Sequence, residues 1–120
     1  MKVTERFLKY VLQNTQSDPL SGTFPSSPSQ LLFADLLAEE MKSIGISQVY
    51  RDENGYVYGL LPATIPDSKG ATLAFLAHMD TAPDASGESI KPRIIRNYNG
   101  KNILLNDKEN LIMSLRIFQI

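Results

Sequence analysis

Residues 71–77 (ATLAFLA) are nearly all apolar and stand between two polar stretches that contain turn-forming residues. A short apolar run of this kind is typical of a β-strand that is buried on both faces. Such a strand needs neighbouring strands at its edges and other elements over its faces. The run therefore predicts an α/β fold in which a mixed sheet packs against helices.

Further short strands are predicted on both sides of this run. The sequence Asn54-Gly55 is a strong hairpin signal, and it lies between two segments rich in valine and tyrosine. A second Asn-Gly pair, at residues 99–100, separates two later candidates. The expected strands, besides the apolar run, are residues 49–51, 56–61, 93–96 and 103–105.

The clearest helix is expected to begin at Pro28. Ser27 is a favourable N-cap, and Gln30 three residues later completes the pattern of a capping box. Gly45 suits the position just after the helix, where a left-handed backbone conformation is common. The apolar face of this helix is expected to comprise Leu32, Phe33, Leu36, Leu37, Met41 and Ile44.

An amphipathic helix is also expected over residues 4–14, where Phe7, Leu8, Val11 and Leu12 recur at helical spacing. Between the two helices, residues 15–28 are rich in Ser, Pro and Gly. This composition predicts an irregular connection. A plain surface loop is the favoured interpretation, and an excursion close to a functional site is the alternative.

Composition excludes several classes of function. The 120 residues include 12 basic and 13 acidic side chains and carry a net charge of −1, with no basic stripe for nucleic acid or an anionic membrane. Cysteine is absent, so neither a disulfide framework nor a thiolate site is available. The charged N-terminus lacks the apolar core of a signal peptide. We therefore expect a cytoplasmic protein.

His78 is the only histidine, and it directly follows the apolar run. Asp80 lies two residues later, so both side chains project to one side if the backbone stays extended. A metal-bound imidazole commonly donates its second ring N–H to a carboxylate. The pair thus fits a zinc ligand and its orienting carboxylate. A histidine at a strand end followed by an aspartate turn is the alternative.

Other catalytic arrangements lack their residues. No Gly-x-Ser-x-Gly elbow and no phosphate-binding glycine-rich loop is present. Asp84 and Glu88 follow the His-x-Asp pair, but they lie among turn residues and are assigned no role.

Several ordered segments together resemble the peptidase T family, tripeptide aminopeptidases among the di-zinc aminopeptidases and carboxypeptidases. The segments are ERFLKYVLQNTQS, MKSIGI, DENGYVYGLLPATIP, ATLAFLAHMDTAPDASG and KPRIIRNYNGKNILLN. The similarity extends over about residues 5–114, and HMDTAPD with the following Ser-Gly is its most diagnostic part.

The resemblance implies a zinc-dependent aminopeptidase that releases the N-terminal residue from tripeptides. It implies that His78 is a zinc ligand and that Asp80 is the catalytic carboxylate orienting it. It also implies that residues 1–120 are the N-terminal part of the catalytic domain. The other zinc ligands, the general base and the dimerisation domain of the family have no counterpart here, so we expect the isolated chain to be inactive and not to bind zinc stably.

Two alternatives remain beside the enzyme. The chain could be a non-catalytic interaction module, forming a homo-oligomer through the apolar segment 111–120, or a truncated fragment that retains the fold. Where the resemblance leads us to expect Ser-Pro, the sequence has Ser114-Leu115. Truncation, an altered reading frame and a native ending all remain open for this region.

Overall fold

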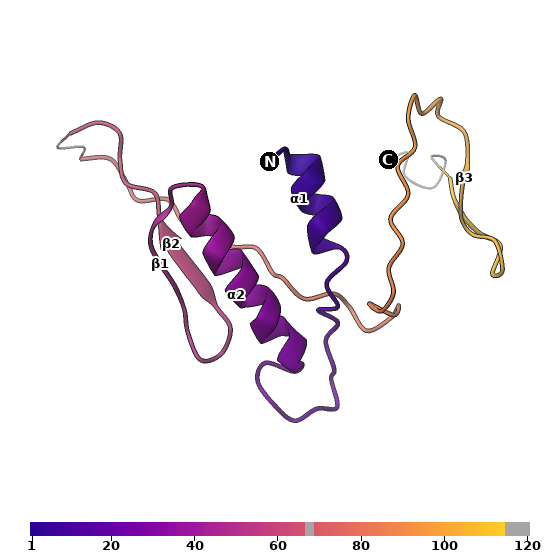
Figure 1. Ribbon diagram of the computed structural model, residues 1–120, viewed down its shortest axis with the longest axis horizontal. Coiled ribbons are helices and arrows are strands. Elements are labelled where there is room, and N and C mark those ends of the chain that lie inside the picture. The colour runs from indigo at the N-terminus through magenta and orange to yellow at the C-terminus, as the bar shows by residue number, and fades with distance from the viewer. Residues whose placement is uncertain (67–68, 115–120) are drawn as a thin grey trace.

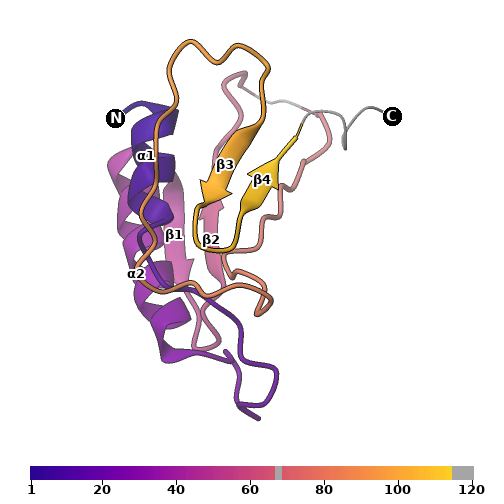
Figure 2. The same cartoon turned by 90° about the vertical axis from the view of Figure 1, so that its right-hand side faces the viewer.

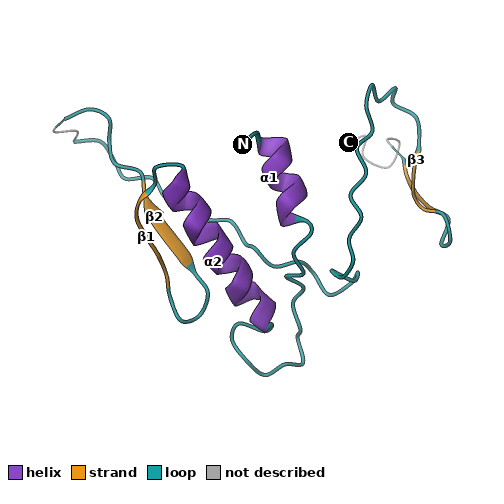
Figure 3. Ribbon diagram, in the orientation of Figure 1, coloured by secondary structure: helices purple, strands orange, loops and turns teal. Residues whose placement is uncertain are grey.

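The computed structural model describes residues 1–66 and 69–114. In chain order its elements are α1 (Val3–Tyr10), α2 (Pro28–Ser43), β1 (Ser47–Arg51), β2 (Val57–Leu60), β3 (Ile103–Asn106) and β4 (Leu111–Met113). Helix α2 lies between α1 and the β1–β2 hairpin, and β3–β4 stands apart from them (Figures 1 and 3). The fold is therefore a loosely packed mixture of helices and strands.

The strands form two separate antiparallel hairpins, β1 with β2 and β3 with β4. Figure 2 shows them as distinct ribbons, magenta for the first and orange to yellow for the second. The mixed α/β class that the sequence predicts is confirmed. The expected single mixed sheet is wrong for the described residues, because no strand joins the two hairpins.

Helix α2 has the predicted start but not the predicted capping box. Pro28 is its first residue, and Ser27 adopts an extended N-cap conformation. The Ser27 hydroxyl oxygen lies 2.7 Å from that of Ser29, so it makes no cap to the helix backbone. The Gln30 side-chain amide instead donates to the carbonyl oxygen of Thr15. Gly45 has a φ of 89°, which confirms the left-handed position after the helix.

The β1–β2 hairpin confirms the Asn54-Gly55 prediction. The Asp52 carboxylate accepts from the backbone N–H groups of Asn54 and Tyr56, at 3.0 and 2.9 Å, and Gly55 has a φ of 89°. The hairpin packs on α2 at Gly59. A Cβ atom added there would lie 2.5 Å from both Met41 Cε and Ile46 Cγ2, so a larger residue would have to displace these side chains.

The core is small and centres on one face of α2. Its buried apolar residues are Phe33, Ala34 and Ala38. The Tyr10 ring from α1 and the Phe33 ring form a T-shaped pair, with ring centroids 5.4 Å apart. The expected apolar face is confirmed only in part, because Leu32 and Ile44 are exposed.

An ion-pair cluster also joins the two helices. The Arg6 guanidinium lies 2.6 Å from the Glu40 carboxylate, and the Lys9 ammonium lies 3.6 Å from it. Helix α1 ends at Tyr10, so it is shorter than the expected helix over residues 4–14. Among the described residues, no helix is long and apolar enough to cross a membrane.

Residues 71–77 do not form the predicted buried strand. The segment is irregular, and Leu73, Phe75 and Leu76 are 78%, 94% and 92% exposed. A buried strand needs hydrogen-bonded neighbours and covered faces, and no described segment supplies either. Residues 93–96 are likewise irregular rather than a strand.

The β3–β4 hairpin confirms the strand expected at residues 103–105. Its pairing brings Ile103 opposite Met113 and Leu104 opposite Ile112. Residues 111–113 of the apolar segment 111–120 form β4 and pair with β3, which the sequence does not predict. Residues 115–120 lie outside the described part of the chain.

Candidate functional site

The His78–Asp80 segment is tied to the connection between the helices. Gln16 and Thr81 form an isolated parallel bridge. The Ser17 N–H donates to the Thr81 carbonyl at 2.9 Å, and the Thr81 N–H donates to the Thr15 carbonyl at 3.2 Å. The connection is therefore irregular, as predicted, but it lies beside the candidate site. This position agrees with the alternative interpretation of residues 15–28, and the functional role of the neighbouring residues stays a prediction.

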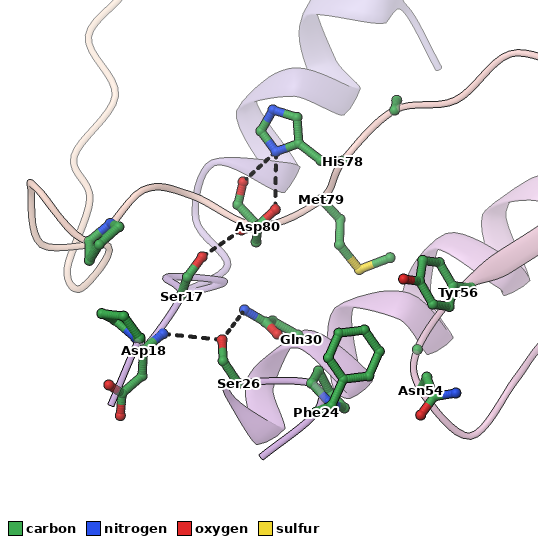
Figure 4. Close-up of a pocket in the computed structure, with 15 residues that line it drawn as sticks. Ser17, Asp18, Phe24, Ser26, Gln30, Asn54, Tyr56, His78, Met79 and Asp80 are labelled. Atoms are coloured by element: carbon green, nitrogen blue, oxygen red, sulfur yellow. Dashed lines mark hydrogen bonds and ion pairs between the residues drawn. The ribbon is translucent and has the colours of Figure 1, made fainter. Parts of the chain in front are cut away.

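The structure brings His78 and Asp80 together. Nδ1 of His78 lies 3.1 Å from Oδ1 of Asp80 and 2.9 Å from the Asp80 carbonyl oxygen (Figure 4). A backbone carbonyl oxygen can only accept a hydrogen bond, and so can an oxygen of an ionised carboxylate. These two partners therefore assign a proton to Nδ1. In the neutral imidazole with this tautomer, Nε2 carries the free lone pair. The His78 side chain is 84% exposed, so this nitrogen can coordinate a metal ion.

The second carboxylate oxygen of Asp80 has its own donor. The Ser17 hydroxyl donates to Oδ2 at 2.5 Å. The hydrogen bond from Ser17 lowers the pKa of the Asp80 carboxyl below its ordinary value, burial opposes this, and His78 adds to the lowering. Asp80 is thus ionised at neutral pH and engaged through both oxygens.

Gln16 holds the loop that follows Asp80. Its side-chain amide donates to the Pro83 carbonyl at 3.2 Å, and its side-chain oxygen accepts from the Gly87 N–H at 3.0 Å. The Asn14 side chain accepts from the Gln16 N–H at 3.1 Å. One glutamine therefore satisfies two loop backbone groups across about seventy residues of sequence.

A buried pair anchors this connection to α2. The Gln30 side-chain amide donates to the Thr15 carbonyl and to the Ser26 hydroxyl, each at 3.3 Å. The Asp18 N–H donates to the same Ser26 hydroxyl at 3.1 Å. The position of Ser17 beside Asp80 is thereby linked to the helix through Thr15 and Gln30.

A cleft of about 500 Å³ opens between these segments. Its apolar wall includes Phe24, Tyr56 and Met79, and the centroids of the two aromatic rings are 6.1 Å apart. Met79 points toward Tyr56, while His78 and Asp80 border the cleft (Figure 4). The space combines an apolar wall with one imidazole and one carboxylate, a composition common in ligand-binding sites.

The donor set for a metal is incomplete in the described part of the chain. No group of three histidine, cysteine, aspartate or glutamate side chains is positioned there to hold an ion. Asp84 and Glu88, for which no role is predicted, are both exposed. A catalytic zinc ion commonly takes three protein ligands. His78 fits one of them, and its role and that of Asp80 stay predictions.

Sequence reasoning missed three residues of this site, namely Gln16, Ser17 and Gln30. Their partners lie up to seventy-one positions away, as for Gln16 and Gly87, and no local pattern encodes such a contact. The capping-box pattern predicts that Gln30 bonds the start of α2, whereas its side chain bonds the Thr15 carbonyl. A polar residue at the start of an amphipathic helix was the one available signal.

No family model matches the sequence, but individual relatives do. Peptidase T of Caldanaerobacter subterraneus subsp. tengcongensis is 53% identical over 117 residues, which are 98% of this chain and 28% of that protein. Peptidase T of Halothermothrix orenii is 50% identical over 113 residues, 94% of this chain and 28% of that protein. Peptidase T of Clostridium acetobutylicum is 49% identical over 117 residues, with shares of 98% and 28%.

These identities extend over nearly the whole sequence, from both helices through the His78–Asp80 segment to the region of β3. The chain spans 28% of the length of the curated relatives that it matches. The resemblance seen in the sequence is confirmed, and the chain is a homologue of peptidase T over a segment corresponding to 28% of that protein's length.

Proposed function

We propose that this chain contributes one side of the active site of a zinc-dependent aminopeptidase, which releases the N-terminal residue from tripeptides. The observation that carries the proposal is the His78–Asp80 contact in a homologue of peptidase T. Asp80 accepts a hydrogen bond from Nδ1–H, and the His78 side chain is exposed beside a cleft. The proposed roles are zinc ligand for His78 and catalytic, orienting carboxylate for Asp80.

The chemistry of the two side chains suits these roles. When bound, zinc polarises a carbonyl oxygen and lowers the pKa of water. Asp80 keeps the Nδ1 proton on His78, which fixes the tautomer and makes Nε2 a better electron-pair donor. The exposed ring of His78 lies at the border of the cleft, so its side chain is accessible to a metal ion there.

We further propose that residues 1–120 correspond to the N-terminal part of a catalytic domain in a cytoplasmic enzyme. The other zinc donors, the general base and the dimerisation domain then come from other segments of a longer protein, and the isolated chain is inactive. Two observations support this: the incomplete donor set among the described residues and the exposure of the apolar residues 71–77. Both observations fit a segment that needs further parts of the protein to complete its donor set and to cover its apolar residues.

The test is a graft. Residues 1–114 replace the matching segment in peptidase T of Caldanaerobacter subterraneus subsp. tengcongensis, which is 53% identical. We expect the purified graft to cleave a tripeptide in the presence of zinc. His78→Ala should abolish the cleavage, and Asp80→Asn should lower it about 10- to 100-fold. An active graft that tolerates His78→Ala would overturn the proposal.

A second candidate is a non-catalytic interaction module that binds another copy of itself. It is favoured by the exposed apolar side chains of β4, namely Leu111, Ile112 and Met113. Sedimentation of the 120-residue chain separates the two functions. A dimer that Ile112→Asp dissociates, combined with an inactive graft, would favour the module.

A further inference from the structure

We propose that Ser17 is a positioning residue, which holds the Asp80 carboxylate at the side-chain torsion that points one of its oxygens at His78. This inference rests on the proposed function, since it assigns a supporting residue to the same site. Ser17 itself contacts no substrate or metal ligand in this assignment. It acts only through Asp80.

The two oxygens of Asp80 have different partners. Oδ2 accepts from the Ser17 hydroxyl at 2.5 Å, and Oδ1 lies 3.1 Å from Nδ1 of His78. The terminal torsion of an aspartate side chain is broad and roughly two-fold, so it does not select an orientation by itself. A donor fixed on one oxygen supplies that selection. Ser17 therefore determines the carboxylate torsion, at which the other oxygen faces the imidazole.

Ser17 must be the donor in this contact, because an ionised carboxylate can only accept. The same hydroxyl oxygen lies 3.1 Å from the carbonyl oxygen of Thr81, a competing acceptor. The hydroxyl has one hydrogen, and a hydrogen bond to a charged acceptor is the stronger of the two choices. The proton accordingly goes to Asp80.

The backbone around Ser17 is held independently of this hydroxyl. Ser17 N–H donates to the Thr81 carbonyl, and Thr15 accepts from the Thr81 N–H on the other side of Gln16. Thr15 is itself buried and bound by Gln30. These contacts do not involve the Ser17 side chain, so removal of the hydroxyl leaves the frame that carries it.

Nuclear magnetic resonance of the metal-free 120-residue chain tests the inference. The readouts are the ¹⁵N shifts of the His78 ring, which report its tautomer, and the ¹³Cγ shift of Asp80. The informative pair is Ser17→Thr and Ser17→Val, because these side chains have the same shape and differ by the hydroxyl. Ser21→Ala is the matched control. Ser21 lies in the same connection, and its hydroxyl accepts only from the Thr23 N–H among the described contacts.

We expect Ser17→Thr and Ser21→Ala to preserve both signatures. In Ser17→Val, the ratio of the Nδ1–H to the Nε2–H tautomer should fall about threefold, the size expected for loss of one modest hydrogen bond. The ¹³Cγ resonance of Asp80 should shift as well. Equal spectra for the Thr and Val variants would overturn the assignment, whether or not both variants alter the backbone bridge.

The measurement uses neither zinc nor peptide, so its outcome is independent of the proposed function. In an active graft, Ser17→Val should lower kcat more than it raises KM, and Ser17→Thr should restore kcat. An inactive graft with a Val-specific loss of the tautomer would contradict the peptidase proposal alone. An active graft with identical Thr and Val spectra would contradict the Ser17 proposal alone.

Discussion

The Gln30 side-chain amide donates to the carbonyl oxygen of Thr15 across 3.3 Å, and both residues are buried. This contact joins the first turn of α2 to the connection that reaches the candidate site. Gln30→Ala would leave the Thr15 carbonyl without that donor. The Thr15 carbonyl keeps the hydrogen bond from the Thr81 N–H, so only one bond is lost. One such bond contributes about 0.5–1.5 kcal/mol, and we expect a loss of that size in urea unfolding.

Gln13→Ala is the matched control for this change, because Gln13 is exposed and no side-chain contact is described for it. Its free energy of unfolding should change by less than about 0.5 kcal/mol. Equal effects of the two substitutions would contradict the anchoring role of Gln30.

Phe33 and its neighbour Leu32 give a direct test of the core. Phe33 is 7% exposed and Leu32 is 72% exposed, although the sequence predicts both on one apolar face. Phe33→Ala should lower the free energy of unfolding by about 3 kcal/mol, because it empties the main contact between α1 and α2. Leu32→Ala should cost less than about 1 kcal/mol. Unfolding curves measured by circular dichroism compare the two variants. A larger loss of stability in Leu32→Ala than in Phe33→Ala would contradict the proposed core.

Glu40 gives the fold a predictable response to acid. Burial raises the pKa of its carboxyl, but Tyr10, Lys9 and Arg6 together outweigh burial and bring it below the ordinary value. A carboxyl with a lowered pKa in the folded state contributes stability above its unfolded pKa. That contribution is lost as the pH falls through the ordinary glutamate range toward the lower folded value.

The melting temperature should therefore decrease on acidification in this window, and Glu40→Gln should flatten the decrease. Glu39→Gln is the control, because the one ion-pair partner of Glu39 among residues 1–66 and 69–114 is the exposed Lys42 on the surface of α2. If Glu39→Gln flattened the curve as much as Glu40→Gln, the helix–helix ion cluster would not be its source.

Zinc calorimetry on the isolated chain tests the incomplete donor set. One imidazole and its orienting carboxylate are too few ligands for stable zinc binding, so the intact chain and His78→Ala should give the same weak heats. Saturable binding with one zinc per chain, lost in His78→Ala, would be the contrary result. It would mean that this chain, or two copies of it, completes the ligand shell.

Local patterns in the sequence predicted local structure well. Pro28 and Gly45 bracket α2 because proline suits a helix start and glycine suits the left-handed residue after its end. Asn54-Gly55 forms the first hairpin for a related reason. His78 and Asp80 meet because their spacing of two is itself local.

Non-local structure was harder to predict. Residues 71–77 have the composition of a buried strand, but composition does not supply the neighbours that bury it. Ser17 and Asp80 lie sixty-three residues apart, and their contact depends on the bridge between Gln16 and Thr81. The His-x-Asp spacing and the family resemblance both predict a role for the Asp80 carboxylate, whereas only the three-dimensional arrangement reveals the hydroxyl that contacts it.

The most direct test of the central claim is the zinc content of the purified graft, compared between the intact His78 form and His78→Ala. The resemblance to di-zinc peptidases predicts about two zinc ions per intact graft and about one in the variant, because one ion loses its imidazole ligand. Asp80→Asn should retain more zinc than His78→Ala, since it removes only the partner of the ligand. Unchanged zinc content in a folded His78→Ala graft would contradict the assignment of His78 as a metal ligand.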